Sequence, residues 1–130
     1  MSIKGFHHVA IKSVNFKKSL EFYTDVLGLK KVNAWGSGEN SAVMLALGDD
    51  SRIELFAGGS TIENIDSPII HIAFNVDDPD FYIEKVRAYG LEVTAEPKDV
   101  DVLGTPGFKA RIAFCKGIDG EILEFFTTKQ

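Results

Sequence analysis

The tetrapeptide HVAI at residues 8–11 returns, little changed, as HIAF at residues 71–74. A second match follows each copy, because LGL at 27–29 corresponds to YGL at 89–91. The histidines are 71 − 8 = 63 positions apart and the glycines 90 − 28 = 62, so one deleted residue aligns the two halves. Internal similarity at such a period indicates a repeated supersecondary unit, each copy being too small to bury its own apolar face.

The first half of the chain has the pattern of a strand, a helix and three strands. Apolar residues recur at three- and four-residue steps from Phe16 to Leu27, which predicts an amphipathic helix with Asn15 as its N-cap and Gly28 just past its end. Strands are predicted on either side of this helix, first over residues 6–12 and then over the runs LKKVNAW, SAVMLALG and SRIELFAG.

The second half repeats this order. PIIHIAFNV predicts a strand, and Asp78, Pro79 and Gly90 predict the start and the end of a helix. LEVTAE, KARIAFCKG and EILEFFTT predict three more strands, and PKDVDVLGTPG is expected to be a lid or a long connection. We therefore expect one α+β domain over residues 1–130, with βαβββ modules at about 4–60 and 68–128 that share a sheet or a barrel-like cup.

Composition excludes several classes of protein. No apolar run approaches the ~20 residues that span a bilayer, and the N-terminus MSIKGF lacks an export signal. The net charge of −5 is spread along the chain, which argues against a nucleic-acid partner. The single cysteine, Cys115, allows no internal disulfide and is expected to be a buried, inert thiol. We expect a cytoplasmic protein with a small-molecule partner, no membrane and no nucleic acid.

The adjacent histidines at the start of the chain are expected to differ. Strand alternation places His8 on the side of the small Ala10, and His7 on the opposite side with the β-branched Val9. A small neighbour leaves room for a ligand, so His8 is the candidate for function. A hydrogen-bonded strand histidine without chemistry is the alternative for either residue.

His8 has counterparts that share its position in the repeat. His71 is followed two places on by Ala73, as His8 is by Ala10. Glu54 and Glu124 each interrupt an apolar run in the last strand of a half. By alternation, the residues that flank each glutamate face a packed interior, and the two histidines and two glutamates lie on the opposite surface. There the four side chains could converge on a divalent cation that offsets the burial of the carboxylates. Taken singly, each glutamate also suits a solvent-facing or ion-paired position.

The whole chain resembles the vicinal oxygen chelate superfamily, whose members are built from paired βαβββ modules. The resemblance rests on HHVAI, SLEFYTDVLGL, RIELF, HIAFNVDD and DGEILEFF. It implies that His8, Glu54, His71 and Glu124 are metal ligands and that curved mixed sheets form a metal-binding cup. It also implies a homodimer, since short members often compose each cup from modules of two chains.

Among the members, the presence of all four ligands resembles the glyoxalase I-like lyases and isomerases most. The resemblance implies a lactoylglutathione lyase-like reaction, with proton transfer through a metal-bound enediolate, Glu124 as the catalytic base and one Ni, Co, Zn or Mn ion. The alternatives are a non-catalytic binding or sequestering protein and an epimerase of an acyl-CoA or related substrate. Glutathione-using members commonly carry a cation where this chain has Asp25. Candidate side chains for the mouth of the cup are Phe6, Lys12, Trp35, Phe108 and Arg111, and the alternative for each is core packing or a solvated charge.

Overall fold

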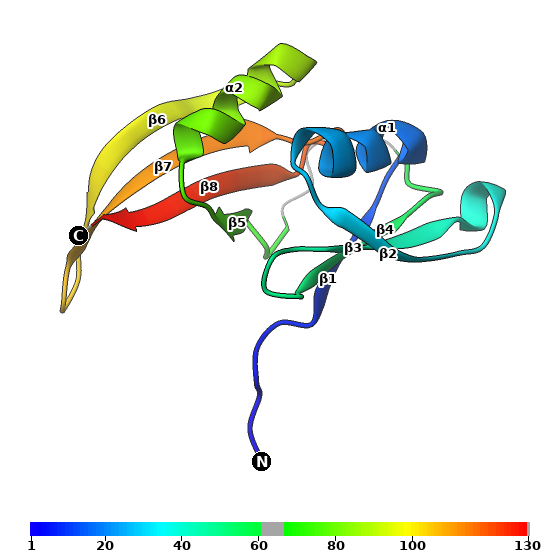
Figure 1. Cartoon of the computed structure of the whole chain (residues 1–130), viewed down its shortest axis with the longest axis horizontal. Coiled ribbons are helices and arrows are strands. Elements are labelled where there is room, and N and C mark those ends of the chain that lie inside the picture. The colour runs from blue at the N-terminus through cyan, green and yellow to red at the C-terminus, as the bar shows by residue number, and fades with distance from the viewer. Residues whose placement is uncertain (61–66, 130) are drawn as a thin grey trace. The chain divides into compact units, whose positions relative to one another are not determined.

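The computed structural model describes residues 1–60 and 67–129. The chain divides into two compact units, Met1–Glu63 and Asn64–Gln130. Each unit contains one four-stranded mixed sheet, and the elements follow one another in the order expected from the repeat (Figure 1). The predicted α+β fold class is confirmed. In the described part of the chain, no helix is long and apolar enough to cross a membrane.

The first unit is built on a sheet with the strand order β1-β4-β3-β2, in which β1 runs parallel to β4 and the other pairs are antiparallel. The Asn15 side chain accepts a hydrogen bond of 3.1 Å from the Lys18 N–H and caps the helix as predicted. The elements are β1 (His8–Lys12), α1 (Phe16–Glu21) with a π-helical turn over Phe22–Val26, β2 (Lys30–Trp35), a 3-10 turn over Gly38–Asn40, β3 (Ala42–Ala46) and β4 (Arg52–Phe56).

The second unit repeats this topology with the order β5-β8-β7-β6, and again the first and last strands of the module are parallel. Its elements are β5 (Ile72–Asn75), α2 (Pro79–Tyr89), β6 (Val93–Val102), β7 (Phe108–Lys116) and β8 (Ile122–Lys129). Asp78 caps α2 by accepting a 3.1 Å hydrogen bond from the Asp80 N–H. Gly90 ends the helix with φ at 97°, a conformation that glycine adopts without strain.

The two faces of each sheet differ in what covers them. In the second unit α2 packs on the side of Cys115, Leu123 and Phe125, all buried, and the Tyr82 ring stacks on Phe125 at 5.4 Å between centroids. In the first unit Leu45, Ile53 and Leu55 form the corresponding buried side. We call the opposite surfaces the Glu54 face and the Glu124 face, because these glutamates lie on them.

We expected the stretch PKDVDVLGTPG to be a lid or a long connection, but most of it is strand. β6 continues through Pro97 to Val102, and only residues 103–107 make the turn into β7 (Figure 1). Pro97 is tolerated because β6 is the edge strand and its pairing with β7 is irregular between Ala95 and Lys98. The segment is one arm of a hairpin rather than a lid.

Candidate metal centre

The first unit brings His8 and Glu54 together. In the parallel pair of β1 and β4, Ala10 lies opposite Glu54, and His8 precedes Ala10 by two residues on the same face. Nε2 of His8 is 3.6 Å from Oε1 of Glu54. The Glu54 side chain is 15% exposed and that of His8 39%, so the carboxylate is mostly covered while the ring remains accessible.

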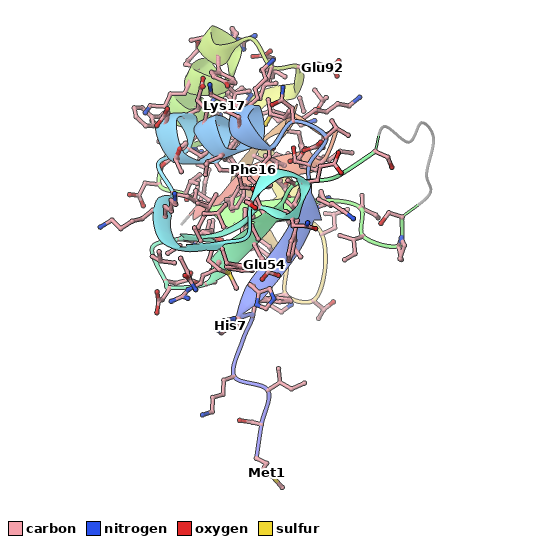
Figure 2. The ribbon with its side chains drawn as sticks, turned by 90° about the vertical axis from the view of Figure 1, so that its right-hand side faces the viewer. Met1, His7, Phe16, Lys17, Glu54 and Glu92 are labelled. Carbon is pink, nitrogen blue, oxygen red and sulfur yellow. The ribbon has the colours of Figure 1, made fainter. Side chains whose placement is uncertain are left out.

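His7 departs from the alternation expected of it. The pairing of β1 with β4 begins at His8, so His7 lies just before the strand. It stands at one end of the sheet that contains Glu54 (Figure 2). Its Nδ1 lies 2.9 Å from Nδ1 of His8, and the two rings meet edge to face. The prediction that the rings point to opposite sides is wrong. One Nδ1 donates and the other accepts, which orients the His8 ring with Nε2 toward Glu54.

The second unit forms the equivalent pair from His71 and Glu124. Ala73 lies opposite Glu124 in the parallel pair of β5 and β8, and His71 precedes Ala73 by two residues. Nε2 of His71 is 3.1 Å from Oε1 of Glu124, and the Phe114 ring contacts the His71 ring edge to face. Burial raises the pKa of the Glu124 carboxyl, and the charge and hydrogen bond of the neighbouring His71 act in the opposite direction.

In each pair, the imidazole nitrogen and the carboxylate oxygen are separated by about the distance expected of two ligands of one divalent ion. Imidazole nitrogen and carboxylate oxygen bind such ions at about 2.0–2.2 Å, so two neighbouring ligand atoms of one ion lie roughly 3.0–3.5 Å apart. The observed separations of 3.6 Å and 3.1 Å are close to this range. Among residues 1–60 and 67–129, no group of three or more His, Cys, Asp or Glu side chains gathers to hold a metal. Each unit therefore contributes half of the predicted ligand set.

Aromatic side chains stand next to both pairs. Phe56 and Phe126 each follow a glutamate by two residues and so lie on its face. The Trp35 ring contacts Phe56 at 6.3 Å between centroids, and Phe108 contacts Phe126 at 6.4 Å. Trp35 and Phe108 were expected near the site, whereas Phe56 and Phe126 were not considered. The signal for them was the repeated E-x-F in RIELF and EILEFF.

Arg111 is not at the mouth of a cup. It alternates with Ala110 and Ile112 on β7 and lies on the side of the sheet that α2 covers. Its guanidinium donates to both carboxylate oxygens of Asp80, at 2.6 Å and 2.8 Å, and to Asp99 at 3.1 Å. These contacts fasten the first turn of α2 to β6 and β7, so the role of Arg111 is structural.

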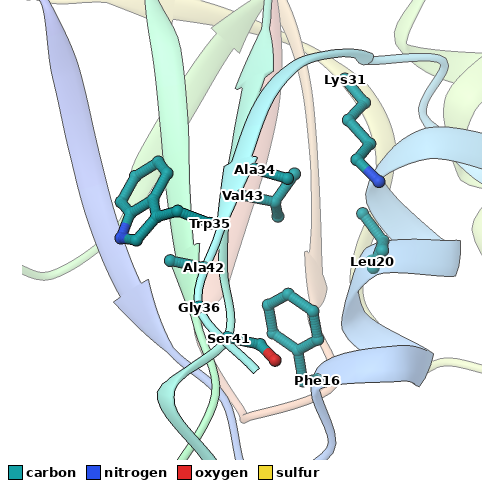
Figure 3. A pocket seen from close by; sticks show the side chains of 9 residues that line it. All are labelled: Phe16, Leu20, Lys31, Ala34, Trp35, Gly36, Ser41, Ala42 and Val43. Atoms are coloured by element: carbon teal, nitrogen blue, oxygen red, sulfur yellow. The ribbon is translucent and has the colours of Figure 1, made fainter. Parts of the chain in front are cut away.

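A hollow of about 240 Å³ lies on the other side of the first sheet, between α1 and the strands β2 and β3. Figure 3 shows Phe16, Leu20 and Lys31 around it, with the Trp35 indole directed away from these side chains. Since its walls include the buried Val43 rather than Glu54, this hollow is separate from the metal-ligand candidates.

Comparison with known proteins shows the family. The model of the Glyoxalase/Bleomycin resistance protein/Dioxygenase superfamily matches residues 5–125, and the chain belongs to this superfamily. A probable lactoylglutathione lyase of Vibrio parahaemolyticus is 31% identical over 129 residues, covering 95% of this chain and 90% of the relative.

Solved structures agree on the fold. The trypanothione-dependent glyoxalase I of Leishmania major has a TM-score of 0.72 at 25% identity, covering 96% of this chain and 87% of that one. The antibiotic-binding protein TnmS3 of Streptomyces has a TM-score of 0.76 at 17% identity, covering 99% of both chains, and shows the fold alone. The structures similar to this chain therefore include both an enzyme and an antibiotic-binding protein on one architecture.

Proposed function

We propose that this protein is a metal-dependent lyase or isomerase of the glyoxalase I type. The observation that carries the proposal is the duplicated His–Glu pair, built by the same strand register in both units. Relatives about 30% identical that are named lactoylglutathione lyases support the reaction class.

The proposed ligands are His8, Glu54, His71 and Glu124, and together they would hold one divalent ion. Two neutral imidazoles and two carboxylates balance the charge of +2 and suit Ni, Co, Zn or Mn. When bound, the ion would supply a Lewis acid for two neighbouring oxygens of the substrate.

Glu124 is the proposed catalytic base. Its task is to remove a proton from the carbon beside a carbonyl and to return it to the adjacent carbon or to the opposite face. Glu124 is only 7% exposed, so its carboxylate is largely covered from bulk water. Nε2 of His71 lies 3.1 Å from one oxygen of this carboxylate, a separation that suits two ligands of the same ion. The Phe114 ring beside His71 limits the access of water on that side.

The substrate is proposed to be a small molecule with two neighbouring oxygens, such as a hemithioacetal or an acyl-CoA epimer. The assembly is proposed to be a homodimer. An apolar surface around each His–Glu pair also suits a protein that binds or sequesters a small molecule without converting it, and this is the second candidate function.

Metal-loaded and metal-free protein, compared in deuterated buffer by proton NMR, separate the two candidates. We expect about one divalent ion for each ligand set and metal-dependent conversion of a methylglyoxal hemithioacetal or of an acyl-CoA epimer. Protein that takes up no Ni, Co, Zn or Mn, yet binds small molecules unchanged, would be a sequestering protein instead.

A further inference from the structure

The hollow between α1 and the first sheet has apolar side chains on two opposite walls. Phe16 and Leu20 of α1 form one wall, and both are only partly buried. Ala34 of β2 and Val43 of β3, which lie opposite each other in the strand register, contribute to the other wall. The side chain of Ala34 is too short to reach α1, so the space between the helix and the edge of the sheet stays open.

A bulge in β2 turns Lys31 toward this hollow. Lys31 lies opposite Leu45, and Ala34 lies opposite Val43. Both partners are buried on the same face of β3, and residues directly opposite each other in an antiparallel pair share a face. Residues 31 and 34 would alternate to opposite faces of a regular strand. The register shift between Lys31 and Asn33 instead brings both side chains to the side of α1.

The two polar side chains of the hollow lie at its two ends. Figure 3 shows the Lys31 ammonium group near Leu20 and the Ser41 hydroxyl near Phe16. None of the lining residues is acidic, and in the part of the chain that the structure describes no carboxylate pairs with Lys31. Ser41 is neutral, so the charge is confined to the Lys31 end. A ligand with one negative charge would complement it.

The volume of the hollow limits the size of this ligand. An apolar cavity of about 150 Å³ accommodates benzene. A hollow of about 240 Å³ therefore admits one aromatic ring with a short substituent, whereas drug-sized ligands occupy roughly 300–1,000 Å³. The Phe16 ring in the wall favours an aromatic ligand, because two rings attract each other in edge-to-face or offset contact.

We infer that this hollow is a second small-molecule site, which binds a single-ring aromatic monocarboxylate with its ring between Phe16 and Val43 and its carboxylate on Lys31. The ammonium group supplies a charge-assisted hydrogen bond at the open end, and the ring removes apolar wall surface from water. The site lies on the opposite side of the first sheet from Glu54, so the inference does not depend on the proposed function.

Titration of ¹⁵N-labelled protein with three small probes tests the inference by NMR. Metal-free protein is used, because a carboxylate can also bind a metal ion. Phenylacetate is expected to shift the amide signals of α1 and β2 and to bind about threefold or more tightly than phenylacetamide, its neutral analogue. Acetate carries the charge without the ring and should cause no comparable shifts.

Three variants locate the site. Lys31→Met keeps the length and the apolar stem of the side chain but removes its charge, so it should abolish the preference for phenylacetate over phenylacetamide. Lys30→Met is the matched control, because Lys30 lies opposite Ala46 on the other face and its loss should leave the preference unchanged. Ala34→Leu fills the hollow and should weaken both ligands by about tenfold or more; Ala34 is exposed on an edge strand, so the variant is expected to fold.

Absence of shifts in α1 and β2 at millimolar phenylacetate would overturn the inference and leave the proposed metal centre untouched. Survival of the preference in Lys31→Met would also overturn it, since the lysine would then only cover apolar surface with its stem. If the same signals move with protein concentration in the absence of ligand, a second copy covers the hollow and the inference is wrong.

Discussion

Glu124 lies 3.1 Å from His71 through the same parallel-strand register that places Glu54 near His8. In both units the histidine precedes by two residues an alanine that faces the glutamate across the strand pair. The duplication therefore extends beyond secondary structure to the orientation of two side chains. A fold that repeats an imidazole–carboxylate pair in this way is suited to a chelating centre.

The contact between His7 and His8 predicts that substitutions of the two residues reduce metal affinity by different amounts. His8→Ala removes a proposed ligand and should abolish high-affinity metal binding. His7→Ala removes only the partner of His8 Nδ1, and we expect metal affinity to fall by about tenfold, the lower end for the loss of a hydrogen bond that orients a metal ligand. Metal titration followed by calorimetry measures both effects.

Ile70 provides the control for this comparison, since it is the counterpart of His7 before the second module and is also exposed. Ile70→Ala should leave metal affinity unchanged. Equal loss in the His7 and Ile70 variants would show that the His7–His8 hydrogen bond does not orient the ligand.

A homodimer that composes its centre from two chains predicts complementation. His8→Ala and His71→Ala proteins should each bind metal poorly. In the mixed dimer, one centre should regain all four ligands if each centre takes its two units from different chains. Metal content after verified subunit exchange measures this, and absence of recovery would mean that one chain supplies the whole centre.

The ion pair between Arg111 and Asp80 predicts a pH-dependent contribution to stability. The hydrogen bonds from Arg111 hold the pKa of Asp80 below its ordinary value of 3.8. The stabilisation is therefore complete above that ordinary value and is lost as pH falls through the lower pKa of the folded state. Asp80→Asn should lower the urea midpoint near pH 7, and the difference from wild type should shrink in acid, as pH falls below 3.8.

Asp101→Asn is the control for this measurement, because Asp101 is an exposed acidic residue on the neighbouring β6. It should cause little change at either pH. A destabilisation by Asp80→Asn that persists undiminished in acid would attribute the effect to the substitution itself rather than to the ion pair.

Cys115 is predicted to be unreactive in the folded protein. Burial raises the pKa of its thiol to about 12, so almost none of it is thiolate near pH 8. Ellman's reagent should label the thiol only after denaturation. Rapid stoichiometric labelling of the native protein would contradict the buried position of this residue beneath α2.

The repeat in the sequence was sufficient to predict the βαβββ order, both helix caps and the four residues of the His–Glu pairs. These features depend on local periodicity and on residues a fixed distance apart. Arg111 was misplaced because the side it faces depends on how β7 pairs with β8, and a shift of one residue reverses every side chain. His7 was misplaced because alternation holds only within the strand, which begins at His8.

The strand and turn over residues 97–107 were missed for a related reason. Proline and glycine together are typical of a loop, but an edge strand does not need the missing N–H of Pro97. The edge position of β6 is a property of the folded sheet and is not visible in the local sequence.

The central claim is that Glu124 transfers the substrate proton beside a metal held by both His–Glu pairs. Glu124→Gln keeps the shape of the side chain and one oxygen ligand but cannot accept a proton. Glu54→Gln, the same change at the corresponding position of the first unit, is its matched control.

The most direct measurement is solvent deuterium exchange at the substrate carbon, compared for the two variants at equal metal loading. We predict that exchange falls by a factor on the order of a hundred to ten thousand in Glu124→Gln, and far less in Glu54→Gln. Undiminished exchange in metal-loaded Glu124→Gln would contradict the account and transfer the role of base to another residue.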